Sequence, residues 1–287
     1  MAIIQTTFDE IKAYIQTNPH VSDESRNEAL QVLTKLACKE VVDNTAFHSV
    51  VGFDPHDKSI FWDMTKGNLL AVNKVGKAID SLGCTMILVS LILRFSKKQV
   101  QYYLFTYDAP PSYLRENEHC NGSVSVIYDK NYIRYVELFA QIFDELKYRK
   151  TLSEEELARL PFLVIVFGNF TRRILEADER FSEFYSMLLQ EGKSLRIACM
   201  IATTHFENEP FYHRYPNAFT CRLVGDVFPA TASELLLSVP DQIGNENPST
   251  KKMVFQDNKT QTLVQTHHFA LGVALNCPIL NGKWFKS

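Results

Sequence analysis

Leu160-Pro-Phe-Leu-Val-Ile-Val-Phe-Gly-Asn-Phe170 holds six consecutive apolar residues, 162–167, between a proline and a glycine. A strand without any polar position has no face to offer to water, so it belongs in a sheet that is covered on both sides. Sheets covered on both sides by helices are mostly parallel. This stretch therefore predicts an α/β fold.

Apolar runs of strand length alternate with amphipathic segments of helix length on either side of this stretch. The expected strands are 69–72, 101–107, 162–167, 196–203 and 220–224, and the expected helices are 81–94, 132–149, 172–190 and 231–238. Runs 49–53 and 59–63 flank a polar tip, as do runs 253–256 and 262–269, so each pair predicts a β-hairpin. Together these segments predict a doubly wound, mostly parallel sheet with added hairpins.

Two helices are expected before the first hairpin. Thr7 and Glu10 have the spacing of a capping box, and a second helix is expected to begin near Ser22. We expect residues 1–46 to be a helical lead-in and residues 47–287 to be the α/β domain. Ser153 and Glu156 predict another capping box, at the start of a short helix.

Composition excludes several classes of protein. Of the 287 residues, 30 are Lys or Arg and 33 are Asp or Glu, and the resulting net charge of −3 disfavours a nucleic-acid partner. The longest apolar run, 84–93, has about half the roughly 20 residues that cross a bilayer. The six cysteines are widely spaced, which predicts reduced core residues, and no histidine or cysteine spacing indicates a metal site.

In an open parallel sheet, ligands bind at the carboxyl ends of the strands. The first such end is followed by residues 73–81, Asn-Lys-Val-Gly-Lys-Ala-Ile-Asp-Ser. A phosphate-binding loop needs several glycines, then Lys and a hydroxyl residue. If Lys77 is aligned with the lysine of this motif, the next residue, Ala78, has no hydroxyl. If Ser81 is aligned with the hydroxyl residue instead, no lysine stands directly before it. Neither register completes a site, so this is a degenerate nucleotide-binding loop whose candidate residues are Asn73, Gly76, Lys77 and Ser81.

The second strand end carries Gly168 and Asn169. A nucleotide hydrolase places carboxylates there, to hold hydrated magnesium and to orient the attacking water. Neither residue can carry a charge. Losing one such electrostatic element commonly lowers the rate on the order of 10² to 10³-fold, so we expect no useful hydrolysis.

The order of these segments resembles the FtsK/SpoIIIE class of P-loop ATPases, and within it the type VII secretion ATPases of the EssC kind. The likeness covers about residues 50–269 and is greatest to the last of their tandem ATPase modules. The hairpin from Val51 to Asp63 and the following Gly67-Asn-Leu-Leu70 match the lead-in to the phosphate loop. Segments 87–91, 94–100, 102–108, 160–166 and 197–204 match later parts of the domain, the last two at the Walker B strand and the sensor strand.

The resemblance implies a RecA-like P-loop NTPase core. It makes Gly168 and Asn169 a degenerate Walker B end, and Thr203 and Thr204 a sensor-like strand end. It also implies a longer, hexamer-forming chain at the cytoplasmic face of a bacterial membrane. The altered residues at both strand ends, by contrast, argue against bound ATP or magnesium. The implied partners are secreted helical-hairpin substrates or adaptors and neighbouring ATPase modules. An ATP-using motor built around Lys77 is the alternative, and a DNA translocase is a weaker one.

Four further residues are candidates for partner binding. Arg172 and Arg173 follow the altered strand end, where they could face an acidic partner, with a solvated helix start as the alternative. Leu235 and Leu236 could border a groove for a helical substrate signal, with core packing as the alternative.

Overall fold

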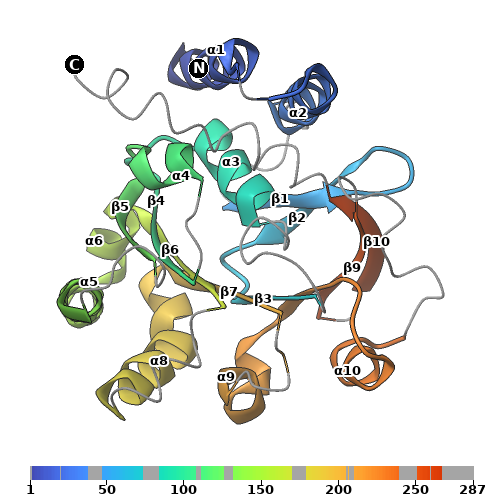
Figure 1. The fold of residues 1–287 in the computed structure, drawn as a ribbon. Coiled ribbons are helices and arrows are strands. Elements are labelled where there is room, and N and C mark those ends of the chain that lie inside the picture. The colour runs from blue at the N-terminus through green and yellow to red at the C-terminus, as the bar shows by residue number, and fades with distance from the viewer. Residues whose placement is uncertain are drawn as a thin grey trace.

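A computed structural model describes residues 2–19, 21–37, 47–73, 84–107, 111–125, 132–169, 179–204, 206, 210–238, 251–258 and 260–266. Across these ranges the strands join into one ten-stranded sheet, in the order β2-β1-β10-β9-β8-β3-β7-β6-β4-β5. Helices cover both faces of this sheet (Figure 1).

The half of the sheet from β8 to β5 is parallel. Its strands are β3 (Leu69–Val72), β4 (Val100–Thr106), β5 (Cys120–Ser125), β6 (Phe162–Gly168), β7 (Ile197–Thr203) and β8 (Cys221–Val224). Strand β6 is buried at every position, between β7 and β4. The predicted α/β fold, with a parallel core covered on both faces, is therefore confirmed.

The other half of the sheet is antiparallel and contains both predicted hairpins. Strands β1 (His48–Phe53) and β2 (Ser59–Asp63) pair with each other, and so do β9 (Lys251–Asp257) and β10 (Thr260–Thr266). Phe53 of β1 lies opposite Gln265 of β10, and β9 pairs with β8. The two hairpins, distant in the sequence, thus extend the parallel half into one continuous sheet.

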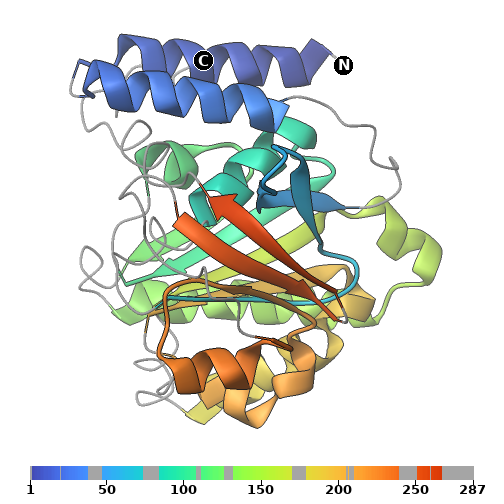
Figure 2. The ribbon, with the colours of Figure 1, turned by 90° about the vertical axis from the view of Figure 1, so that its right-hand side faces the viewer.

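Two apolar cores lie on the two faces of the sheet, and successive strand residues alternate between them. Leu69 and Ala71 belong to one core, and Leu70 and Val72 belong to the other. The first core is covered by α1 (Ala2–Thr17), α2 (Asp23–Ala37), α3 (Cys84–Arg94) and α4 (Ser112–Glu116). The second is covered by α5 (Tyr132–Lys150), α8 (Glu179–Glu191), α9 (Pro210–Arg214) and α10 (Pro229–Leu235). Figure 2 shows α1 and α2 side by side on the side opposite α10.

Some predicted helix ends differ from the observed ones. Helix α1 begins at Ala2, so Thr7 lies inside it and the capping box predicted there was wrong. The capping box of Ser153 is confirmed at the start of α6 (Glu154–Arg159). Helix α10 begins and ends earlier than the predicted 231–238, because Pro229 occupies its first turn. Cys199 and Cys221 are buried thiols, and burial raises the pKa of Cys221 to about 12.

Buried hydrogen bonds attach α3 to the first hairpin. The Ser49 hydroxyl donates to the carbonyl oxygen of Ile87 at 2.7 Å, and the Val50 main-chain N–H donates to the Ser90 hydroxyl at 3.0 Å. Ile11, Ile15 and Leu33 of α1 and α2 are fully buried in the same apolar core. The lead-in helices and α3 are therefore packed through one core onto β1.

A buried arginine holds the amino ends of β6 and β7 together. The Arg149 side chain is fully buried. Its guanidinium donates to the carbonyl oxygens of Leu195 (2.9 Å), Arg196 (3.2 Å) and Pro161 (2.8 Å), and to Glu145 (2.7 Å). Every nitrogen of the guanidinium is thus used, as burial of this charged group requires.

Arg149→Ala should lower the free energy of unfolding by about 3–5 kcal/mol, because it empties a fully buried site and leaves Glu145 and the carbonyl oxygens of Leu195 and Pro161 without this donor. Urea denaturation followed by circular dichroism measures the loss. Arg159→Ala is the matched control, because Arg159 is 72% exposed in its ion pair with Glu155, and it should cost less than about 1 kcal/mol. Equal losses for the two variants would contradict the role given to Arg149.

Candidate functional site

The carboxyl ends of β3, β7 and β6 meet at one edge of the sheet. Val72 lies opposite Thr203, and Gly168 lies opposite Ala202. Of the predicted site residues, the structure brings five together here, namely Asn73, Gly168, Asn169, Thr203 and Thr204. Gly76, Lys77 and Ser81 of the predicted loop lie outside the described residues, as do Arg172 and Arg173.

Asn169 links the ends of β6 and β7. Its main-chain N–H donates to the carbonyl oxygen of Ala202 at 2.8 Å. Its side-chain Oδ1 accepts from the main-chain N–H of Thr204 at 2.8 Å and from the Thr204 hydroxyl at 3.2 Å. The backbone at Asn169 is left-handed, with φ of 49°, a conformation that asparagine adopts more readily than most residues.

This arrangement determines the chemistry available at the end of β6. An amide oxygen carries no net charge, and here it already accepts two hydrogen bonds from Thr204. Gly168 before it has no side chain. Neither position offers a carboxylate to hold hydrated magnesium or to take a proton from water.

Asn73 lies at the end of β3, next to the end of β8. It is buried, and its main-chain N–H donates to the carbonyl oxygen of Thr203 at 3.2 Å. A Cβ atom at Gly225 would come within 3.2 Å of Asn73 Oδ1 and 3.0 Å of Met253 Cε. Gly225 thus gives Asn73 the space for its amide, a role that the sequence analysis missed and that glycine directly after a strand could have signalled.

The two leucines proposed for partner binding pack into the second core. Leu235 is fully buried and Leu236 is 7% exposed. This burial favours the core-packing alternative for both side chains. Leu237, the next residue, is 64% exposed, and Phe228 just before α10 is 54% exposed. Near α10, the apolar side chains that face solvent are therefore Phe228 and Leu237, and not the predicted Leu235 and Leu236.

The described residues were also considered as a metal site and as a membrane span. Within the described ranges, no group of three or more His, Cys, Asp or Glu side chains is placed to hold a metal ion. None of the helices in those ranges combines the length and the apolar character that a membrane span needs.

Comparison with known proteins identifies the fold. No protein-family model matches the sequence, and no curated protein matches it. Among solved structures, the cytoplasmic domain of the Thermomonospora curvata type VII secretion ATPase EccC is similar, with a TM-score of 0.64 and 16% identity over 91% of this chain and 33% of that one. EssC (ATPases 2 and 3) from Geobacillus thermodenitrificans is similar with a TM-score of 0.60 and 16% identity, over 79% of this chain and 45% of that one.

A third similar structure is T. curvata EccC (ATPases 2 and 3) in complex with a signal sequence peptide. Its TM-score is 0.54 and its identity is 15%, over 78% of this chain and 41% of that one. The chain thus spans between one third and one half of the length of these three structures. At such identities the likeness establishes the fold, and it confirms the P-loop ATPase fold that the sequence resemblance implied.

Asn169→Ala should lower the free energy of unfolding by about 1–3 kcal/mol, because the two Thr204 donors lose their acceptor and alanine is strained at a positive φ. Asn169→Gly separates the two causes, since it removes the acceptor without strain. Asn169→Asp keeps an acceptor oxygen and should be nearly neutral. These values come from chemical denaturation, and a loss for Asp as large as that for Ala would refute the assigned role of the amide oxygen.

Proposed function

We propose that this chain is a module of a type VII secretion machine that has kept the P-loop ATPase fold but does not hydrolyse ATP. The observation that carries the proposal is the end of β6, where Gly168 has no side chain and the Asn169 amide is bonded to Thr204. A motor needs negative charge at this point to hold magnesium. In this chain Asn169 instead joins the ends of β6 and β7 by hydrogen bonds.

The altered loop after β3 adds to this argument. Residues 73–81 contain one glycine, Gly76, and Lys77 is followed by Ala78 rather than by a hydroxyl residue. The chain thus departs from the motor pattern at both strand ends that contact the phosphates and the metal. Rate losses at such groups are large and not simply additive, so hydrolysis is expected to be absent rather than slowed.

The proposed role is docking of substrates or adaptors and control of active modules. Similar structures are ATPase domains of type VII secretion proteins, and one of them holds a signal sequence peptide. By analogy, the partners of this chain are secreted helical hairpins, their adaptors and neighbouring ATPase modules. We place it in a longer, membrane-anchored and hexamer-forming protein, on the cytoplasmic side of a bacterial membrane.

Calorimetric titration of the chain with Mg-ATP, at protein concentrations near 100 μM, should give no saturable heat, because the charged groups for a triphosphate and its metal are missing. Neither the unaltered chain nor the double variant Gly168→Asp/Asn169→Glu should turn over ATP. The variant restores carboxylates at the end of β6, but the loop after β3 remains incomplete. A dissociation constant of about 10 μM or tighter for the unaltered chain would support the ATP-using motor and contradict the proposal.

Titration of the isotope-labelled chain with a purified secreted helical hairpin should shift amide resonances in a saturable way. Because Phe228 and Leu237 present apolar side chains to solvent near α10, Phe228→Ser and Leu237→Ser should each raise the dissociation constant about tenfold. Ile133→Ser is the matched control, because Ile133 is 60% exposed on α5. An unchanged spectrum at high hairpin excess would count against docking of this partner class.

A further inference from the structure

A pocket of about 440 Å³ lies at the amino edge of the sheet, at the opposite strand ends from the altered nucleotide site. Its walls come from residues just before three parallel strands, namely Gly67 and Asn68 before β3, Lys193 before β7 and Thr220 before β8. The remaining lining residues are Lys66, Leu189 and Gln190, and residues 214–218 from the end of α9 through the short helix η4 (Pro216–Ala218). Its volume is in the range of small-molecule sites, roughly 300–1,000 Å³.

Asn68 fixes the floor of this pocket. Its Nδ2 donates to the carbonyl oxygens of Leu189 (3.3 Å) and Ala218 (3.0 Å), and its Oδ1 accepts from the main-chain N–H of Cys199 (2.8 Å). One buried side chain thereby holds together the end of α8, the helix η4 and strand β7. The pocket is formed before any ligand arrives, which lowers the ordering cost of binding.

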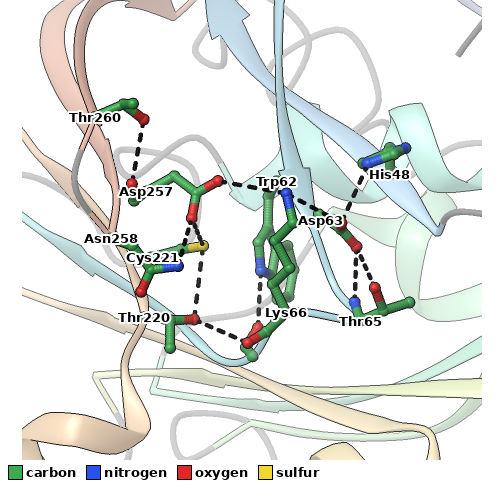
Figure 3. Close-up of polar contacts among 11 residues, drawn as sticks. His48, Trp62, Asp63, Thr65, Lys66, Thr220, Cys221, Asp257, Asn258 and Thr260 are labelled. Carbon is green, nitrogen blue, oxygen red and sulfur yellow. Dashed lines mark hydrogen bonds and ion pairs between the residues drawn. The ribbon is translucent and has the colours of Figure 1, made fainter.

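A second wall is held by the contacts drawn in Figure 3. The Trp62 indole N–H donates to the carbonyl oxygen of Gly67 at 3.0 Å, and the Thr220 hydroxyl donates to that of Lys66 at 3.3 Å. Gly67 has φ of 143°, and a Cβ there would come within 2.6 Å of the Thr220 hydroxyl oxygen. Only glycine fits this turn without strain.

The charges that line the pocket are all positive. They belong to Lys66, Lys193 and Arg214, and no aspartate or glutamate is among the lining residues. Lys66 is already paired, since its ammonium lies 3.5 Å from Asp63 and 3.9 Å from Asp257 (Figure 3). The charge of Lys66 is therefore largely compensated by these two carboxylates, which do not line the pocket.

Lys193 and Arg214 are the two cations of the pocket that are available to a ligand. Neither forms an ion pair with a carboxylate of the described part of the chain, and Glu191, close to Lys193 in the sequence, pairs with Lys150 instead. The Arg214 guanidinium donates through one nitrogen to the Ser182 hydroxyl at 2.8 Å. Because a guanidinium has five N–H donors, others remain for a planar anion.

Some main-chain N–H groups in and beside the pocket wall are already used or missing. The N–H of Ala218 donates to the carbonyl oxygen of Tyr215 at 3.0 Å, and the N–H of Cys221 donates to that of Asn68 at 3.2 Å. Pro216 has no N–H to offer. An anion here would thus contact the two side-chain cations, and their charges and the fork of Arg214 suit carboxylate groups.

From these observations we infer that the amino-edge pocket binds a small dicarboxylate, with its two carboxylates at Lys193 and Arg214. The inference goes beyond the proposed function, because it concerns the opposite edge of the sheet from the one where this fold binds nucleotides. It stands whether or not the chain binds ATP.

Succinate is the probe, titrated into the isotope-labelled chain while amide resonances are followed. Saturable shifts are expected at the residues lining the pocket, with no shifts from the neutral isostere succinamide. Lys193→Gln and Arg214→Gln should each weaken succinate binding about tenfold, the usual effect of losing a charge-assisted hydrogen bond. Lys58→Gln removes the same charge from the tip of the first hairpin, outside the pocket, and should leave the affinity unchanged.

Three results would overturn the inference. One is the absence of saturable shifts at millimolar succinate, and another is equal weakening by the Lys58 and Lys193 variants. Inorganic phosphate binding as tightly as succinate would refute the preference for a carboxylate. Circular dichroism of each variant shows that it is folded, so lost binding is not mistaken for lost structure.

Discussion

The parallel half of the sheet has no face that can be left to water, and the rest of the structure depends on this constraint. Because successive residues of β3 and β6 enter different cores, both sides of the sheet must be covered by helices. Helices on both sides require crossover connections, which align the strands in one direction. Their carboxyl ends then meet at a single edge, where Asn169 and Thr204 bond to each other.

The sequence predicted most of this fold because its strongest signals are local. Continuous apolar runs identified the parallel strands except β5, whose sequence from Cys120 to Ser125 is largely small and polar, as an edge strand can be. Each hairpin was visible from its own turn, but their joining through Phe53 and Gln265 was not, because pairing over such a separation leaves no local pattern. Helix α1 extends beyond the cap that its sequence suggested.

The site was predictable in position but not in detail. Strand ends can be located from apolar runs, so residues 168–169 and 203–204 were each placed at a strand end. That their two strands are neighbours was not predicted. The bond between Asn169 and Thr204 spans 35 positions and depends on a left-handed backbone that the sequence does not reveal. The amino-edge pocket was missed for a related reason, since Lys66, Lys193 and Arg214 come from three distant segments. In the folded chain, hydrogen bonds from Asn68 and from Thr220 bring the pocket walls together.

The two buried hydrogen bonds between β1 and α3 have a mechanical consequence. Ser49 and Ser90 tie the strand and the helix together inside a dry core, where such bonds resist sliding. A force applied to the N-terminal helices would therefore pass through their shared apolar contacts to β1 and α3 as one lever.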